Sequence, residues 1–235
     1  MRGGRSGAPD ASVTVSTGDG DCPAIVAPER VTGQDGDVRF AFVSGNPALD
    51  LVGTVGYRRD EPVDLLDAPA ALEQWVLECE ELPDHVTADA ADLASALRLR
   101  EAVHRLALDR LAGRPFAPAE LDVVNTAAAG PLPAVELGDG GLRRAGDLRS
   151  ALVQVARSAV TVLADRSVPL KECGRAGCTR LYLDRSRGAR RTWCGMDACG
   201  NRVKAAAYRA RRQAARHGPE AASRSGAAPG PEGAG

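Results

Sequence analysis

The sequence of 235 residues predicts an α+β protein, in which a mainly helical N-terminal domain with a few short strands precedes a small cysteine-rich segment and a basic helix. Three observations predict this class. Apolar residues at helical spacing dominate residues 69–164, short β-prone runs lie around them, and four of the six cysteines stand between residues 173 and 199. The length allows one or two domains.

The first part of the chain has no regular pattern of apolar residues. Residues 1–37 are rich in Gly, Asp, Ser and Thr, a composition that cannot bury enough apolar surface to offset the entropy lost on ordering, so we expect a mobile leader. The β-prone run at residues 38–43 then meets Gly45-Asn46-Pro47, and the text ALDLVGTV follows. This order predicts a strand, a turn and a second buried segment.

Four helices are expected between residues 69 and 164. Pro69 begins the first, and a proline after its end closes it. The second starts near residue 87, ends at Gly113, and carries Glu101 and Arg105 four residues apart, as a surface ion pair does. A shorter helix covers residues 118–129 and a long one covers about 147–164, with a hairpin between them. We expect Leu111 and Val160 on the inward faces of the two long helices.

The charges are divided unevenly along the chain. Residues 1–170 carry 16 basic and 26 acidic side chains, whereas residues 171–217 carry 13 basic and 3 acidic ones. No run of about 18 apolar residues could span a bilayer, and the N-terminus lacks the apolar core of a secretory signal. We therefore expect a cytoplasmic protein without a membrane partner. Residues 218–235 are rich in Gly, Pro and Ala, and we expect a disordered tail.

The strongest signal is a symmetric pair of cysteine motifs. Each motif is C-x4-C, and fifteen residues separate the two. The four cysteines are Cys173, Cys178, Cys194 and Cys199. Such pairs can hold one Zn²⁺ tetrahedrally, and a site of four thiolates leaves no position open for water, so the predicted ion is structural. Two disulfides or four unrelated thiols are the alternatives; a reducing compartment disfavours the first and the matched spacing disfavours the second.

A basic helix follows the last cysteine and points to a polyanionic partner. Alanine-rich and arginine-rich text favours a helix from Arg202 to about Arg216, with Val203 and several alanines on a stripe that we expect to pack. Guanidinium groups bind phosphates and can form a bidentate fork on guanine, so DNA is the favoured partner. The residues that we expect to contact DNA are Arg202, Arg209, Arg212, Arg216 and Lys204 on the helix and Arg190 and Arg191 before it.

Two stretches of this text are similar to known families. Cys199-Gly200-Asn201-Arg202, preceded by Trp193-Cys194, resembles the CGNR zinc finger, and the similarity extends from Cys173 to about Arg212. ALDLVGTV resembles the opening of the ABATE domain, whose typical text is close to LDFVNT, with Leu51 and Gly53 here in place of Phe and Asn. Proteins with both parts are described as stress-induced bacterial transcription regulators. The resemblance implies an ABATE-like α+β domain at 38–166 and a CGNR-type finger with its basic helix at 167–217.

The functional hypothesis is a transcription regulator that is not an enzyme. The finger would bind DNA, while the N-terminal domain would sense a small-molecule effector or mediate homo-oligomerisation. Asn46, Asp50, Arg58 and Arg59 are the candidate ligand contacts, with local backbone contacts as the alternative for the first two. The other functional hypothesis is a protein-interaction module, or an RNA binder, whose basic finger docks on an acidic partner. The three histidines are scattered, and no phosphate-binding loop or nucleophile motif occurs.

Overall fold

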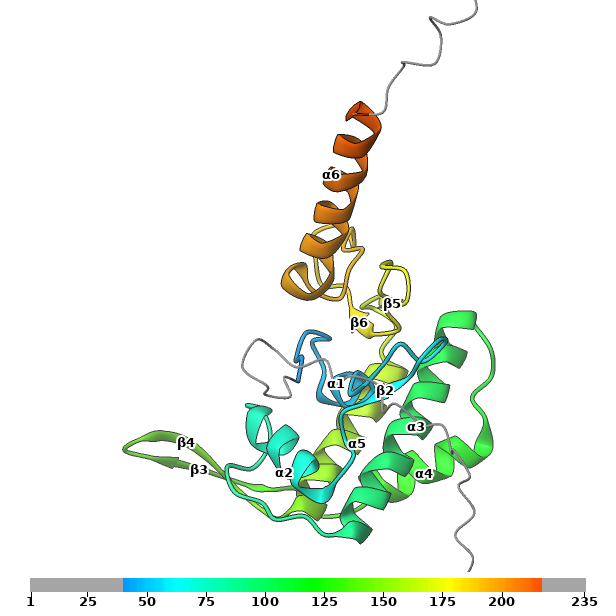
Figure 1. The fold of residues 1–235 in the computed structure, drawn as a ribbon. Coiled ribbons are helices and arrows are strands. Elements are labelled where there is room, and N and C mark those ends of the chain that lie inside the picture. The colour runs from blue at the N-terminus through cyan, green and yellow to red at the C-terminus, as the bar shows by residue number, and fades with distance from the viewer. Residues whose placement is uncertain (1–39, 217–235) are drawn as a thin grey trace, which may run out of the picture.

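The computed structural model describes residues 40–216, and the expected leader at 1–37 and tail at 218–235 lie outside this range. Within it, helices surround a buried core and three separate two-stranded antiparallel sheets lie at its edges (Figure 1). The helices are α1 Pro47–Val52, α2 Pro69–Glu78, α3 Ala90–Ala112, α4 Pro118–Ala128, α5 Leu148–Ala164, the π-helix η1 Met196–Gly200 and α6 Asn201–Arg216. The strands are β1 Val55–Gly56, β2 Val63–Asp64, β3 Ala134–Gly138, β4 Gly141–Ala145, β5 Leu170–Glu172 and β6 Leu181–Leu183. The predicted α+β class is confirmed.

The segment before α2 differs from its prediction. Residues 40–43 form no strand, and the buried run after the turn is the helix α1. Asn46 is the N-cap of α1, because its Oδ1 accepts the N–H groups of Ala48 and Leu49 at 3.0 and 3.3 Å, and Pro47 occupies the first helical position. Asparagine followed by proline is a helix-start signal, and here it overrides the β-branched residues nearby.

The core lies where α1 packs between α3 and α5. Every residue of α1 is buried, and the cluster around it includes Val103 and Leu106 of α3 and Ala156 of α5. Helix α3 begins at a capping box formed by Asp89 and Asp92 and ends at Gly113, whose φ of +64° closes the helix in the left-handed conformation. These local signals place the long helices as predicted.

Two residues that the sequence placed on the buried faces of α3 and α5 are exposed in the structure. Leu111 is 38% exposed and Val160 is 40% exposed, so the inward orientation predicted for both is wrong. The buried stripe of α3 instead runs through Ala96, Leu99 and Val103. Each of the two residues lies at the edge of the buried face of its helix. At such an edge, burial depends on which neighbouring element packs there and not on helical spacing alone.

The charged residues of α3 form a network with the β1–β2 loop. Glu101 accepts Nη1 of Arg58 at 2.7 Å and Nε of Arg100 at 2.9 Å, whereas Arg105 pairs with Glu120 of α4 at 2.7 Å. The predicted Glu101–Arg105 pair is therefore replaced by other partners. Arg58 and Glu120 come from other elements and are pre-positioned by the fold, so their pairing is favoured over a pair four residues apart on the same helix, which adds only a few tenths of a kcal/mol.

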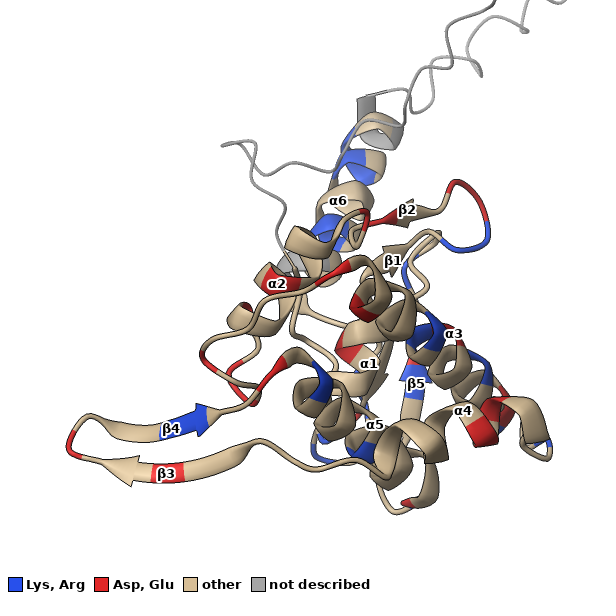
Figure 2. Cartoon of the chain, turned by 90° about the horizontal axis from the view of Figure 1, so that it is seen from below, with Lys and Arg blue, Asp and Glu red and all other residues tan. Residues whose placement is uncertain are grey.

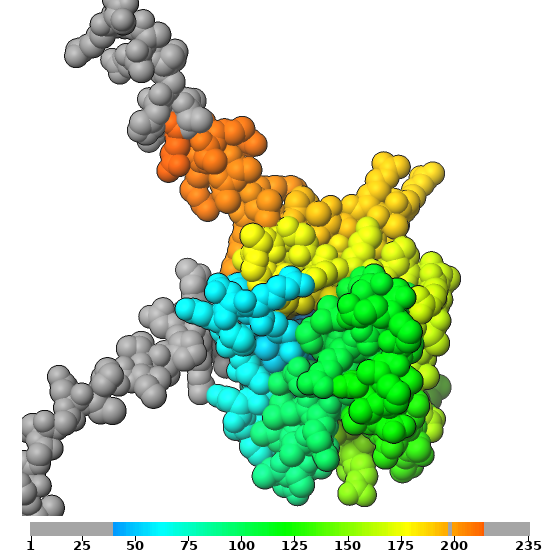
Figure 3. Space-filling view, turned by 90° about the vertical axis from the view of Figure 1, so that its right-hand side faces the viewer, coloured from blue at the N-terminus to red at the C-terminus, as the bar shows by residue number. Residues whose placement is uncertain are grey.

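The hairpin β5–β6 joins the cysteine-rich segment to the core. Leu170, Leu181 and Leu183 belong to the same apolar cluster as α1, and the N–H of Leu183 donates to the carbonyl of Ser44 at 2.8 Å. Beyond this hairpin, α6 projects away from the rest of the molecule (Figures 1 and 3). Within residues 40–216, no helix combines the length and the apolarity needed to cross a bilayer.

Candidate metal centre

Four buried thiols converge at the base of α6. The Sγ atoms of Cys173, Cys178, Cys194 and Cys199 all lie within 4.8 Å of one another. Sγ of Cys199 lies 3.5 Å from that of Cys194 and 3.7 Å from that of Cys178, and Cys178 and Cys194 are 4.0 Å apart. A tetrahedral Zn²⁺ with Zn–S bonds near 2.3 Å requires sulfur separations of about 3.8 Å. The donor set and its spacing therefore fit one zinc ion.

Two tight turns present these thiols. In the first, the N–H of Cys178 donates to the carbonyl of Arg175 at 3.0 Å, and Gly177 adopts a φ of +77° that favours glycine. In the second, the N–H of Cys199 donates to the carbonyl of Gly195 at 3.1 Å at the start of η1. The N–H of Cys194 reaches Sγ of Cys173 at 3.4 Å and so links the turns. Each C-x4-C motif thus contains one of the two turns.

The electrostatic environment favours one thiolate at this site, because burial and the neighbouring sulfurs raise the pKa of Cys194 and Cys199 while that of Cys178 is lowered. Hydrogen bonding from the Cys194 thiol lowers the pKa of Cys178 to about 4, while the same contact and burial raise the pKa of Cys194. One thiol of the cluster thus gives up its proton first, and a bound cation would favour loss of the others. Nε of Arg175 donates to Sγ of Cys199 at 3.1 Å and places a positive charge beside the four sulfurs.

Arg175 also connects the metal centre to the N-terminal domain. Its Nη2 donates to the hydroxyl of Tyr57 at 3.3 Å, and its guanidinium lies 5.5 Å from the centre of the Tyr57 ring. The hydrogen bond to Tyr57 raises the pKa of Arg175. The sequence pattern did not identify this residue. Its position between the first two cysteines was the available signal, but the contact with Tyr57 joins residues 118 apart in the chain.

The loop between the cysteine pairs is ordered by a buried carboxylate. Asp184 accepts Nζ of Lys171 at 2.7 Å, the hydroxyl of Ser186 at 2.6 Å and the N–H of Arg191 at 2.9 Å. Burial would raise the pKa of Asp184, but the hydrogen bonds from Lys171 and Ser186 outweigh it and hold that pKa well below its usual range. The carboxylate therefore stays charged and fixes the path of the loop toward Cys194.

The side chain of Arg191, one of the expected DNA contacts, points into the interior of the finger. Its guanidinium donates to the carbonyls of Val43 and Trp193 at 2.8 Å each and to that of Cys194, and it stacks 4.5 Å from the centre of the Tyr182 ring. These contacts give Arg191 a structural role. Tyr182 and Trp193 pack with the four cysteines.

The other expected DNA contacts whose side chains the structure describes lie on the outside. Arg190 in the loop and Arg202, Lys204, Arg209 and Arg212 on α6 are exposed, and Arg216 is the last residue of α6. Basic residues follow one another along α6, while most acidic residues lie on the body (Figure 2). The alanines of α6 that we expected to pack against the protein are also exposed to solvent, as Ala206, Ala207 and Ala210 show. Helix α6 thus presents both a cationic and a small apolar face to solvent.

The four predicted ligand contacts are engaged within the N-terminal domain. Asn46 caps α1 and its Nδ2 donates to the carbonyl of Ser158 at 3.2 Å, while Asp50 Oδ1 accepts the N–H groups of Val43 and Ser44 at 3.0 Å each. Arg58 pairs with Glu101, and Nη2 of Arg59 lies 2.6 Å from Glu172. None of these four residues lines the cavity that lies between α3, α4 and α5. The geometry favours a structural role for them, which was the alternative for Asn46 and Asp50.

Comparison with known proteins divides the chain just before the hairpin β5–β6. Residues 45–166 match the ABATE family, described as "Putative stress-induced transcription regulator", and residues 170–212 match the CGNR zinc finger. No curated protein matches the chain. The CGNR match contains all four thiols, so the metal centre is the zinc site of this finger. Since the ABATE match covers more than half of the sequence and the finger comes after it, the chain belongs to the ABATE family and carries a C-terminal CGNR zinc finger.

Proposed function

We propose that the protein is a transcription regulator whose finger binds DNA through α6. The supporting observation is that α6 projects from the zinc-binding turns, with the body of the molecule at its N-terminal end (Figure 3) and with Arg202, Lys204, Arg209 and Arg212 exposed. Sixteen helical residues span about 24 Å, long enough to follow a major groove. Four thiolates and one Zn²⁺ leave residues 171–217 with about eight excess positive charges.

The proposed DNA contacts are Arg202, Lys204, Arg209, Arg212 and Arg216 on α6, with Arg190 before it. Arg191 is left out because its guanidinium is held by backbone carbonyls. We assign no enzymatic role: a tetrathiolate zinc has no open coordination position at which water or substrate could be activated. The N-terminal domain would sense an effector or mediate oligomerisation.

Binding to duplex DNA across a salt series tests this proposal. The full-length, zinc-loaded protein is used, because a fragment that starts near residue 165 would expose Leu170, Leu181 and Leu183. Fluorescence anisotropy with a random duplex about three helical turns long should give log K falling linearly with log salt, with a slope near −0.9 for each neutralised phosphate. The variant Arg202→Ala/Arg209→Ala/Arg212→Ala should flatten that slope by up to about 2.7, the sum for three contacts.

A charge-matched control separates these contacts from overall charge. Arg114→Ala/Arg143→Ala/Arg166→Ala removes three exposed arginines from the body and should leave the slope unchanged. An unchanged slope in the α6 variant would refute the assignment of this helix. Tighter binding to single-stranded or double-stranded RNA, or to polyglutamate, than to duplex DNA would instead favour the RNA-binding or protein-docking hypothesis.

A further inference from the structure

The N-terminal domain contains a cavity that its predicted ligand residues do not line. It has a volume of about 500 Å³ and lies between α3, α4 and α5. We propose that this cavity binds an amphiphilic carboxylate, with an aliphatic body inside and its carboxylate held by Arg98 and Arg149. The volume is in the range of small-molecule sites in proteins.

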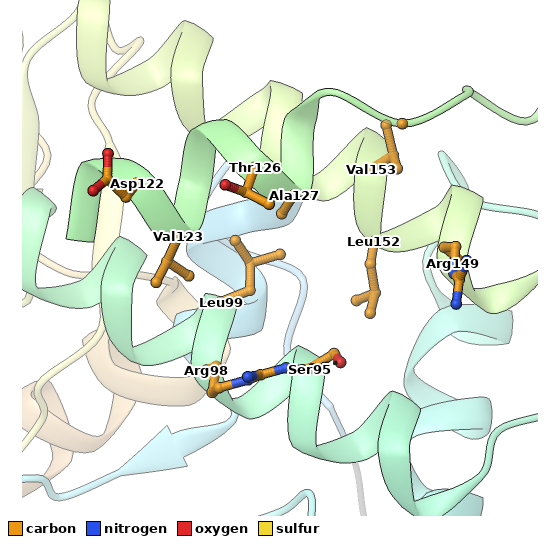
Figure 4. A pocket seen from close by; sticks show the side chains of 11 residues that line it. Ser95, Arg98, Leu99, Asp122, Val123, Thr126, Ala127, Arg149, Leu152 and Val153 are labelled. Atoms are coloured by element: carbon orange, nitrogen blue, oxygen red, sulfur yellow. Dashed lines mark hydrogen bonds between the residues drawn. The ribbon is translucent and has the colours of Figure 1, made fainter. Parts of the chain in front are cut away.

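The floor of the cavity is aliphatic. Leu99 of α3, Val123 of α4 and Leu152 of α5 point toward one common space (Figure 4). Leu99 and Leu152 are only 2% and 7% exposed, so they form the floor, while Val123, at 37%, lies nearer the opening. No aromatic side chain lines this space in the described part of the chain. An aliphatic chain would bury its surface here without leaving a polar group unpaired.

Two arginines at the margin supply the charge. Arg98 extends from α3 and Arg149 from α5 (Figure 4), and both are exposed. Neither forms an ion pair with any residue between 40 and 216, whereas Arg58, Arg100 and Arg105 of the same domain all do.

The polar groups around these arginines leave an excess of positive charge. The hydroxyl of Ser95 accepts Nη2 of Arg98 at 3.4 Å, and Asp122 is the one carboxylate among the described residues that line the cavity. Two guanidinium groups against one carboxylate, in a segment rich in acidic residues, favour an anionic ligand.

Hydrogen bonds and close packing hold two walls of the cavity, α4 and α5, together. Arg157 of α5 donates to the carbonyls of Ala128 and Gly130 at 2.9 and 3.2 Å and holds the end of α4 against α5. A Cβ on Gly130 would lie 2.6 Å from Cγ2 of Val153, so only glycine allows this close approach. A fixed wall lowers the entropy lost on binding.

The helices that form the cavity also lead to the finger. Arg110, near the end of α3, donates to the carbonyls of Val162 in α5 and Val168 just before β5, the latter at 2.8 Å. A ligand in the cavity would therefore contact α3 and α5, the two helices that Arg110 links to the segment before the hairpin β5–β6. That this would change DNA binding rests on the proposed function, but the binding of the ligand does not.

Calorimetric titration of the full-length, zinc-loaded protein without DNA tests the site. The probes are decanoate, 1-decanol and decyltrimethylammonium, which share the aliphatic chain and differ in charge. We expect saturable binding of decanoate at one site, with 1-decanol at least about tenfold weaker and the cation weaker still. Because a charge-assisted contact contributes roughly a factor of ten or more, Arg98→Ala and Arg149→Ala should each weaken decanoate binding about tenfold.

Three further variants make the outcome decisive. Arg143→Ala, an exposed arginine on β4 away from the cavity, should bind decanoate as the parent does. Val123→Trp should fill the opening and abolish binding, and Arg98→Glu/Arg149→Glu should reverse the preference toward decyltrimethylammonium. The proposal is overturned if decanoate does not bind, if 1-decanol binds equally well, or if decanoate binding survives Val123→Trp. Duplex DNA binding that persists alongside any of these results would leave the proposed function standing.

Discussion

At the scale of single residues, Asp50 shows how a buried carboxylate can organise a segment and still lower its stability. Its Oδ1 accepts two backbone N–H groups that precede α1, and it is 8% exposed. Burial raises the pKa of Asp50 to about 6, although hydrogen bonds from Ser44 and Val43 act in the opposite direction. The folded protein therefore binds this proton more tightly than the unfolded chain does, and stability should fall as pH rises from about 4 through about 6.

Asp50→Asn should therefore stabilise the protein at neutral pH. The amide oxygen can accept the same two N–H groups without carrying a charge, and a shift of this size corresponds to at most about 3 kcal/mol. Urea unfolding at about pH 4 and about pH 7 should show a gain that appears only at the higher pH. Asp147→Asn is the opposite control: the Ser150 contacts lower the pKa of Asp147, so its loss should destabilise the protein at neutral pH and not in acid below that pKa. A less stable Asp50→Asn variant at neutral pH would contradict this reasoning.

At the scale of elements, α6 differs from the helices of the body because little of residues 40–200 packs against it. Ala206, Ala207 and Ala210 are exposed, whereas Ala156 of α5 is fully buried. The helical state of α6 therefore depends on intrinsic propensity and on its continuation from η1, where Asn201 has helical φ and ψ of −67° and −37°.

Ala207→Gly/Ala210→Gly should accordingly loosen α6 alone. Each glycine costs an exposed helix about 1 kcal/mol, so helical content measured by circular dichroism should fall and DNA affinity should weaken. The melting temperature of the body should stay unchanged. In contrast, Ala156→Gly should lower that temperature, because it also leaves a space in the core. A shared drop in melting temperature for both variants would show that α6 packs on the body in solution.

Most elements could be predicted because their ends carry local signals. Pro69, Asp89 and Gly113 begin or end helices through their own backbone preferences, and the cysteine spacing specified the zinc ligands before any contact was known. The strand expected at 38–43 was wrong in the described part, since Asn46 and Pro47 begin a helix beside it. The inward turn of Arg191 depends on Val43, 148 residues away, and no short-range pattern contains that contact.

At the scale of the whole molecule, the finger is attached to the ABATE domain at several points. Arg175 contacts Tyr57, Nη1 of Arg185 donates to the carbonyl of Gly45 at 3.0 Å, and the leucines of β5 and β6 lie in the common core. The zinc-binding turns therefore rest on a hairpin that the domain itself stabilises. Metal binding and folding of the domain should be coupled.

Leu181→Ala tests this coupling from the side of the core. Leu181 is 1% exposed, so its truncation should cost about 2 to 5 kcal/mol of unfolding free energy and should also speed the transfer of zinc to a chelator. Leu142→Ala, on the hairpin β3–β4 where Leu142 is 52% exposed, should change neither quantity. Zinc transfer at the parental rate in the Leu181 variant would show that the two parts are independent.

The shared leucine layer also limits how such proteins can be recombined. A graft made at the family boundary, near residue 168, would bring a foreign β5–β6 pair against the native α1 and leave mismatched side chains in the interior. A junction at Asn201 would not divide a buried apolar cluster, because α6 is a solvent-exposed helix. On the proposed function, an exchange of α6 alone should therefore transfer a DNA preference, while the metal-binding turns and the leucines beneath them stay from one parent.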